Sequence, residues 1–355
     1  MKILVINPGS TSTKIAVYKS NTNVFLKNIE HNSEELSKYK KVVDQFEFRK
    51  QEVLDELVCA DCSLNDIKLV IGRGGLLKPM ESGVYRVNDI MIRDIINPMA
   101  EHVSNLGGYI AKEIADIIGN GVQAYIADPS CVDEMDDIAR LSGLPELPRK
   151  SFLHTLNQKA VARRYATEFN KKYEDLNLIV SHMGGGITVG AHSYGRIIDT
   201  NNGLDGDGPF SAERAGSLPA GQLVDLCFSG KYSYSEIRKL LTGNGGLVAY
   251  LKTNNAVEVE KMIQHGDKNA ELVYAAMAYQ VAQNIGAMAT VLKGKVDAIL
   301  LTGGLAYNKI FTAMILERIS FISKVYIYPG ENEMKALAMN GLMILKGELK
   351  AREYE

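Results

Sequence analysis

Three short apolar runs separated by polar turns open the chain. Residues 2–7, 13–18 and 24–26 are rich in Ile, Val and other large apolar side chains, whereas the intervals are mostly Gly, Ser, Thr and Asn. Runs of this kind bounded by turn residues are typical of short strands joined by tight connections. The pattern therefore predicts three successive strands at the start of the fold.

Helix and strand periods then alternate over the rest of the first half. Val53, Leu54, Leu57 and Val58 recur at the spacing of one helix face. The further elements predicted in this half are a strand at 69–71, a helix at about 103–118 and a strand at 122–126. The resulting order is strand, strand, strand, helix, strand, helix, strand.

The second half repeats this order without strong residue identity. Its predicted elements are strands at 178–180, 187–189 and 196–198, a helix at 270–292, a strand at 298–301, a helix at 307–319 and a strand at 325–327. We therefore predict an α/β fold of two duplicated domains, residues 1–150 and 151–331. A last amphipathic helix within 332–355 could complete either domain by its pattern, and we assign it to the first.

Composition narrows the class of protein only slightly. The 355 residues are 46% hydrophobic and 23% charged, and the net charge is −2 without a basic cluster, so we expect no nucleic-acid partner. The first apolar run is too short for a signal peptide or a membrane span. Four scattered cysteines do not suit a disulfide framework, and the pair Cys59 and Cys62 has no second pair to bind zinc. We expect a cytoplasmic protein without a membrane partner.

Candidate chemistry lies in three turns that follow predicted strands. The segment 7–14 is rich in hydroxyls and ends in a cation, and successive backbone N–H groups in such a turn can bind an anion. A strand follows it, whereas a Walker loop or a dinucleotide fingerprint leads into a helix. Residues 184–186 are three glycines at the matching point of the second half, and 302–305 form a third turn. Each turn alone could be a tight connection, but three at equivalent strand ends indicate phosphate binding.

Together these segments resemble the acetate kinase and butyrate kinase family, within the acetate and sugar kinase/Hsp70/actin superfamily. The resemblance covers essentially the whole chain and is carried by residues 7–14, 72–75, 98–102, 128–129, 154–159, 199–216, 302–304 and 329–333. Gly185, Pro129 and the short chain point to the butyrate kinase branch. The resemblance implies two RNase H-like domains with an ATP cleft between them, assembled as a homodimer or a larger homo-oligomer.

The resemblance also implies roles for individual side chains. The expected ATP-binding residues are Asn7, Ser10, Ser12, Lys14, Gly184, Gly185, Gly186, Gly303, Gly304 and Asn308. The expected catalytic residues are Arg73, Asp128, His154, His182 and Arg214. A magnesium ion would be held by Asn7, Asp128 and Glu333, and Glu331 is an alternative to Glu333.

These residue types suit the synthesis of an acyl phosphate. Arg73 and Arg214 can offset the repulsion between a carboxylate and the γ-phosphate, because a guanidinium binds either group bidentately. His154 and His182 could donate to the transferred phosphoryl group, and an ionised carboxylate nucleophile needs no general base. We expect ATP to phosphorylate butanoate, giving butanoyl phosphate and ADP. The alternatives are a kinase of isobutyrate, propionate or acetate, a sugar kinase, and an actin-like or Hsp70-like ATP-binding protein.

Overall fold

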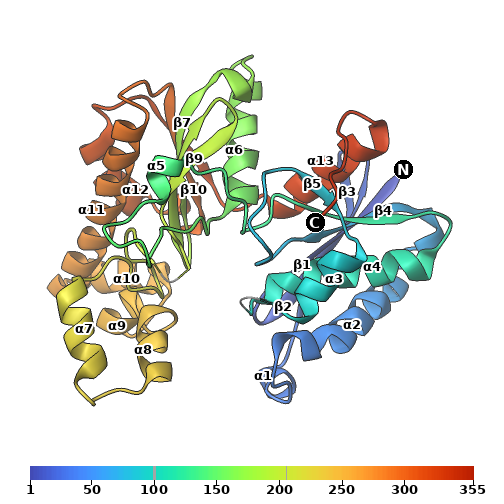
Figure 1. Cartoon of the computed structure of the whole chain (residues 1–355), viewed down its shortest axis with the longest axis horizontal. Coiled ribbons are helices and arrows are strands. Elements are labelled where there is room, and N and C mark those ends of the chain that lie inside the picture. Colours follow the sequence, from blue (N-terminus) through green and yellow to red (C-terminus); the bar gives the residue numbers. More distant parts are fainter. Residues whose placement is uncertain (99–100, 205) are drawn as a thin grey trace. The chain divides into compact units, whose positions relative to one another are not determined.

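The computed structural model describes residues 1–98, 101–204 and 206–355. Two compact units make up the chain, and Figure 1 shows their elements. Unit 1 comprises Met1–Val132 and Asn332–Glu355, and unit 2 comprises Asp133–Glu331. Within the segment 98–102, which we expected to hold functional positions, Met99 and Ala100 lie outside the described residues.

Unit 1 is built on a six-stranded mixed sheet of order β3-β2-β1-β4-β6-β5. Its strands are β1 (Lys2–Pro8), β2 (Ser12–Lys19), β3 (Thr22–Glu30), β4 (Ile67–Arg73), β5 (Val84–Arg86) and β6 (Gln123–Ala127). The first three strands form an antiparallel meander, and β4 and β6 add to it in parallel. The edge strand β5, which we did not predict, pairs antiparallel with β6.

Helices cover both faces of the unit 1 sheet. They are α1 (Ser33–Leu36), η1 (Val42–Gln45), α2 (Phe46–Cys59), η2 (Leu64–Asp66), α3 (Asp89–Ile96), η3 (Val103–Asn105), α4 (Leu106–Ile118) and α13 (Glu333–Lys346). Helices α2 and α4 lie on one face, and α13 packs on β1 and β4 from the other (Figure 1). A Cβ at Gly72 would come within 2.0 Å of the Gly107 carbonyl oxygen, so glycine allows α4 to approach β4 closely.

Unit 2 repeats the arrangement in a five-stranded sheet of order β11-β10-β7-β8-β9. Its strands are β7 (Asn177–Met183), β8 (Ile187–Ser193), β9 (Arg196–Thr200), β10 (Ala298–Gly303) and β11 (Val325–Pro329). Strands β7 to β9 form an antiparallel meander, and β10 and β11 follow in parallel. The order β9-β8-β7-β10-β11 matches β3-β2-β1-β4-β6, which confirms the duplicated α/β unit predicted from the sequence.

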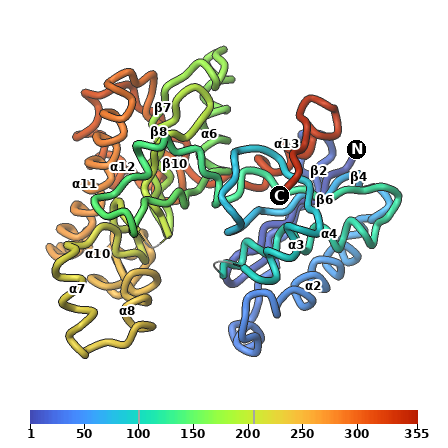
Figure 2. Tube along the Cα trace, viewed as in Figure 1, coloured from blue at the N-terminus to red at the C-terminus, as the bar shows by residue number. Residues whose placement is uncertain are grey.

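Long helices sandwich the unit 2 sheet, and short helices extend one end of the unit. They are α5 (Asp137–Arg140), α6 (Thr155–Glu168), η4 (Tyr173–Asp175), α7 (Ala220–Phe228), α8 (Tyr234–Leu241), α9 (Gly246–Leu251), α10 (Ala256–Gln264), α11 (Lys268–Val291), η5 (Gly304–Tyr307) and α12 (Lys309–Ile319). Helix α11 packs with α12 and on β7 and β8, whereas α6 packs on β7 and β10. Figure 2 shows α7, α8 and α10 grouped near the start of α11.

One face of each sheet is covered by a helix that packs on the parallel strands. In unit 2 this helix is α6, which precedes β7 in the chain and packs on β7 and β10. In unit 1 it is α13, which follows β11 of unit 2 in the chain but packs on β1 and β4. Unit 1 thus takes one of its helices from a distant part of the sequence, and Glu333 at the start of that helix contacts Asn7 and Arg73 at the ends of β1 and β4.

Two details of the sequence prediction are wrong. Residues 133–150, which we placed in the first domain, belong to unit 2, where Asp136 N–H donates to the Ile198 carbonyl and Arg149 pairs with Asp199 at 2.9 Å. Val58 does not share the buried face of Val53 and Leu57, since its exposed fraction is 76%.

No helix in the described parts of the chain combines the length and the apolar composition that crossing a membrane requires.

Candidate active site

Unit 1 brings three of the predicted residues into contact. Asn7 and Arg73 stand at the carboxyl ends of the neighbouring parallel strands β1 and β4, and Glu333 begins α13. Glu333 Oε2 accepts from Asn7 Nδ2 at 2.9 Å and from Arg73 Nη1 at 2.8 Å. Only 6% of the Glu333 side chain is exposed, against 22% for Arg73. The arrangement is a carboxylate held between an amide and a guanidinium.

The first turn lies between Asn7 and Lys14 and connects β1 to β2. Its Gly9 N–H donates to the Ser12 carbonyl at 2.7 Å. Ser10 and Lys14 are exposed and Ser12 is partly exposed, so their polar groups can reach a ligand. The turn is a hairpin between antiparallel strands, as the sequence predicted.

Behind this turn lies Arg49, which the sequence reasoning missed. Its side chain is 0% exposed and donates to backbone carbonyls of the turn. The signal was present in the helix pattern, because Phe46, Arg49, Val53 and Leu57 are the buried residues of α2. A charged residue within a buried stripe calls for a buried polar partner.

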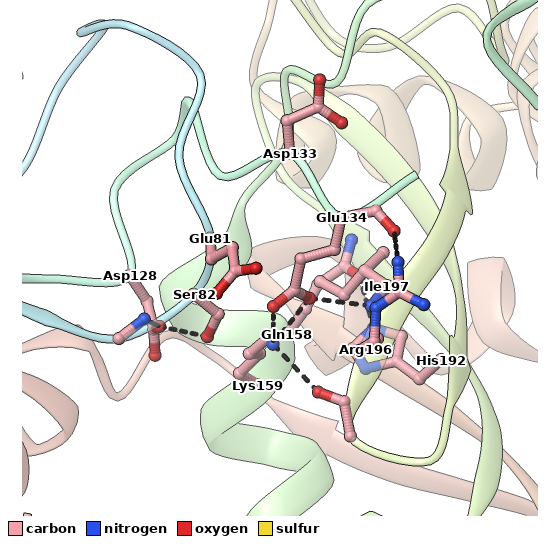
Figure 3. A network of polar contacts seen from close by, with 12 residues as sticks. Glu81, Ser82, Asp128, Asp133, Glu134, Gln158, Lys159, His192, Arg196 and Ile197 are labelled. Carbon is pink, nitrogen blue, oxygen red and sulfur yellow. Dashed lines mark hydrogen bonds and ion pairs between the residues drawn. The ribbon is translucent and has the colours of Figure 1, made fainter. Parts of the chain in front are cut away.

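Asp128 directly follows β6 and is 2% exposed. Its Oδ1 accepts from Ser82 Oγ at 2.6 Å and from the Gly83 N–H at 2.9 Å, and Figure 3 shows the Ser82 contact. Its φ of +41° is in the left-handed region, which non-glycine residues seldom adopt. Backbone strain of this kind persists where surrounding contacts fix the residue, and it concentrates at functional sites.

Unit 2 places Arg214 against the second turn, Gly184 to Gly186. A Cβ at Gly186 would come within 2.2 Å of Arg214 Nη1, so the guanidinium occupies the space that a side chain would fill. Ser211 Oγ donates to the Gly185 carbonyl at 2.6 Å, and Gly184 N–H donates to the Gly186 carbonyl at 3.0 Å. Arg214 also lines a pocket with Ser211 and other residues of this part of unit 2. A fixed cation therefore lies beside a turn without side chains.

His182 and His154 stack at the other end of the second turn. Their ring centroids are 3.9 Å apart with an angle of 12° between the planes, and His182 is 1% exposed. His182 Nδ1 lies 2.8 Å from Asn157 Nδ2, and its Nε2 lies 3.2 Å from Glu331 Oε1. Because an amide nitrogen only donates, His182 Nδ1 is the acceptor in this geometry, and a neutral ring carries its proton on Nε2, the nitrogen that faces Glu331. Asn157 thus fixes the tautomer of His182.

A network of buried hydrogen bonds between α6 and β8 holds His154 in place. His154 Nδ1 lies 3.0 Å from Thr188 Oγ1, and Gln158 Nε2 donates to the same oxygen at 2.9 Å. Gln158 Oε1 lies 2.9 Å from His192 Nε2, and burial holds the pKa of His192 well below its usual range. Gln158 was included in the segment 154–159 by the sequence but received no individual role, because a polar residue on a helix is normally exposed.

Helix α6 also makes a buried ion pair, which ties it to the segment before α6 and to the turn between β8 and β9. Lys159 Nζ donates to Glu134 Oε2 at 2.8 Å and to the Gly195 carbonyl at 3.0 Å, and Figure 3 shows Lys159 directed at Glu134. Glu134 Oε2 also accepts from the Ile197 N–H at 2.9 Å. This pair joins the segment before α6 to the hairpin of β8 and β9, and it is structural.

In the third turn, residues 302–305, and at the start of the following helix, the structure shows why Gly303 and Asn308 suit their positions. Gly303 adopts a φ of +89°, and a Cβ there would come within 2.3 Å of the Met183 carbonyl oxygen. A Cβ at Gly304 would meet nothing within 4 Å, so that position is open. Asn308 caps α12, since its side chain accepts from the Phe311 N–H at 2.8 Å. The structure therefore gives Asn308 a capping role, and its expected role in binding the nucleotide stays a prediction.

The structure separates Glu331 from Glu333, which the sequence left as alternatives for a metal. Glu331 belongs to unit 2 and contacts His182, whereas Glu333 belongs to unit 1 and contacts Asn7 and Arg73. Across residues 1–98, 101–204 and 206–355, no three His, Cys, Asp or Glu side chains gather as metal ligands. Asn7 and Glu333 nevertheless supply two oxygen-bearing side chains in contact, which suits an ion that takes its remaining ligands from phosphates and water.

Comparisons with known proteins agree with these features. The family described as the Acetokinase family matches residues 146–340. Butyrate kinase 2 of Clostridium acetobutylicum is 56% identical over 355 residues, which cover 100% of this chain and 99% of that protein.

Two solved structures share the fold. An acetate kinase from Porphyromonas gingivalis has a TM-score of 0.79 at 18% identity and covers 97% of this chain and 99% of its own. A propionate kinase from Francisella tularensis has a TM-score of 0.76 at 18% identity, with 96% and 98% covered.

Proposed function

The chain belongs to the acetokinase family, and on that premise we propose that it transfers the γ-phosphoryl group of ATP to butanoate. The products would be butanoyl phosphate and ADP. The observation that carries this proposal is the 56% identity to a butyrate kinase over the whole chain. The positions of Arg73, Arg214 and His182 at strand ends and turns support it, because a reaction between two anions needs cations and donors there.

The nucleotide would lie along the three turns described above. In this proposal Asn7, Ser10, Ser12 and Lys14 bind phosphates in unit 1, and Gly184, Gly185 and Gly186 bind them in unit 2. The adenosine would lie near Gly303, Gly304 and Asn308. The open space at Gly304 supports this last assignment, and the bare backbone of the second turn allows close approach of a phosphate.

Cations and donors would divide the work of the transfer. Arg214, which lies against Gly186, would stabilise charge on the phosphoryl group as it moves. Arg73 would bind the substrate carboxylate, for which it must exchange its contact with Glu333. His182 and His154 would donate to oxygens of the transferred group, and Asp128 would assist from its fixed position after β6. The carboxylate is already ionised at neutral pH, so the proposal contains no general base.

Magnesium is the expected companion of the nucleotide. Asn7 and Glu333 would hold it, and Asp128 is the third residue that we assign to it. Bound there, the ion would neutralise negative charge on the nucleotide phosphates. The two side chains are neighbours, since Asn7 Nδ2 donates to Glu333 Oε2 at 2.9 Å, and Asn7 would present its Oδ1 to the ion.

We also propose a homodimer or larger homo-oligomer and a cytoplasmic location, both as the sequence led us to expect. Helix α7 supports self-association, because its residues are largely apolar yet none is buried, and Phe228 is 87% exposed. Light scattering of wild type and of Phe228→Glu tests this contact. A monomeric wild type would overturn the proposal of self-association, and an unchanged mass for the variant would remove α7 from the interface.

Trapping the product with hydroxylamine tests the reaction class. An acyl phosphate gives a hydroxamate that depends on the added acid, whereas a sugar kinase or an actin-like ATPase gives none. Loss of ATP without an acid-dependent hydroxamate would overturn the proposal.

A series of straight and branched acids of two to six carbons then tests the substrate. Butanoate carries two more methylenes than acetate, and each buried CH₂ contributes about 0.8 kcal/mol. Their sum, roughly 1.6 kcal/mol, corresponds to about 15-fold in kcat/KM. We expect butanoate to exceed acetate by about one to two orders of magnitude. Equal or better use of acetate would favour an acetate kinase, and a clear preference for isobutyrate or propionate would favour those alternatives.

A further inference from the structure

Arg49 is a buried cation in the apolar stripe of α2. The buried residues of that helix are Phe46, Arg49, Val53 and Leu57, and the Arg49 side chain is 0% exposed. Burial lowers the pKa of Arg49 to about 10, so the guanidinium is still charged at neutral pH. Placing a charge in the interior is costly unless other groups compensate it.

The compensating groups are carbonyl oxygens of the first turn. Arg49 Nη1 donates to the Gly9 and Ser12 carbonyls at 3.0 Å each, and Nη2 donates to the Ser10 carbonyl at 3.2 Å. Nη1 also donates to Thr13 Oγ1 at 3.0 Å. One side chain therefore fixes three of the four carbonyls between Gly9 and Ser12 from a helix about 40 residues further along the chain.

This clamp determines where the N–H groups of the turn point. In a planar trans peptide the carbonyl of one residue and the N–H of the next point in opposite directions. Because the carbonyls of Gly9 and Ser10 are directed at Arg49, the N–H groups of Ser10 and Thr11 are directed away from it. Two adjacent N–H groups aimed outward form the start of an anion-binding concavity.

The charge of Arg49 has no carboxylate to balance it. In the described part of the chain, no Asp or Glu forms an ion pair with Arg49, and burial is the cause of its lowered pKa. His31, which like Arg49 contacts Thr13 Oγ1, is neutral at pH 7, since burial and the charge of Arg49 lower the pKa of His31 to about 4. The positive field of Arg49 thus extends through the turn without an internal counter-charge.

We propose that Arg49 is a positioning residue for the nucleotide phosphates. It orders the backbone of the first turn, and a bound phosphate supplies the negative charge that the buried guanidinium lacks. The inference rests on the proposed function, because it requires that nucleotide phosphates bind at this turn. Arg49 itself would not touch the nucleotide, and its effect would pass through the turn.

Three variants separate this role from general support of the fold. Arg49→Met removes the charge and the guanidinium donors but keeps an unbranched side chain. Arg49→Lys keeps the charge and loses the planar guanidinium, and it replaces Arg49→Met as the test variant if Arg49→Met fails to fold. Val53→Ala, one turn further along α2 and equally buried, is the matched control, because it loosens the same helix without contacting the turn.

We expect Arg49→Met to weaken ATP and ADP binding, measured by calorimetry, by about 10-fold to 100-fold, the usual effect of losing hydrogen bonds to a charged group. Butanoate KM should change less than about threefold, since the substrate carboxylate lies elsewhere. Arg49→Lys should recover part of the lost nucleotide affinity. Val53→Ala should lower the melting temperature and leave nucleotide affinity unchanged.

Two outcomes overturn the inference. Wild-type nucleotide affinity in Arg49→Met would show that the guanidinium does not act on the phosphates. An equal loss of affinity in Val53→Ala would show that any loosening of α2 has the same effect. Ser12→Ala, a change within the turn itself, separates failure of this inference from failure of the proposed function. If wild type makes acyl phosphate while Ser12→Ala and Arg49→Met both bind ATP normally, the proposed function holds and the turn is not the phosphate site.

Discussion

Replacing Arg73 by Ala should break an ion pair inside unit 1 as well as remove a candidate substrate cation. Arg73 Nη1 lies 2.8 Å from Glu333 Oε2, and the two side chains are 22% and 6% exposed. Removing one member of a buried pair costs about 3–5 kcal/mol, because the other charge loses its partner. Arg73 is partly exposed and Glu333 keeps its bond from Asn7, so we expect about 2–3 kcal/mol.

A double-mutant cycle with Glu333→Gln separates the effect of Arg73→Ala on folding stability from its effect on kcat/KM. The double variant Arg73→Ala/Glu333→Gln holds no uncompensated charge, so it should unfold within about 1 kcal/mol of wild type. A domain of this size loses about 2–4 °C of melting temperature per kcal/mol, so the single Arg73 variant should melt about 5–10 °C lower. Both variants should lose about 10²–10³ in kcat/KM in the hydroxamate assay, because neither has the cation.

The control is Lys268→Ala in α11, whose ion pair with Glu271 is largely exposed. It should change the free energy of unfolding by no more than about 1 kcal/mol. Equal melting temperatures for wild type and Arg73→Ala would refute the buried pair. Recovery of activity in the double variant would refute the direct role of Arg73 and leave only a structural one.

Three further variants test other parts of the site. Arg214→Ala should lower kcat/KM by about 10²–10³ with little change in melting temperature, and near-normal turnover would remove Arg214 from the catalytic residues. Asn157→Ala should lower kcat about tenfold and alter the nitrogen NMR shifts of His182, since its amide fixes the His182 tautomer; an unchanged tautomer would contradict this. Burial and Arg49 lower the pKa of His31 from 6.5 to about 4, so unfolded chains bind more protons between these values. Folding stability should therefore hold above pH 6.5 and fall toward pH 4, by at most about 3 kcal/mol. His31→Gln should flatten this part of the urea-unfolding profile, and an unchanged slope would show that other groups cause it.

The candidate site was predictable where a local signal marked it. The first and second turns follow apolar strands and are rich in Gly and Ser, and the structure forms both as hairpins. Arg73 and His182 were found because they lie at the ends of such strands. Arg49 was missed, and Asn157 and Gln158 received no individual role within the segment 154–159, because each lies on a helix where a polar residue is normally exposed. Burial gives these three side chains their partners; the apolar spacing of α2 indicated it for Arg49, whereas no local pattern indicated it for Asn157 and Gln158.

The sequence by itself determined the order of strands, their grouping into two similar units and the turns between them. These features depend on residues close in the chain, since apolar spacing and turn chemistry act over a few positions. The apolar pattern of α13 fits either unit, and only the tertiary structure decided that this helix completes unit 1. It also decided that Glu333 meets Arg73, 260 residues away, while Glu331 meets His182. These pairings depend on which surfaces pack together, and packing joins residues whose separation along the chain carries no signal of their contact.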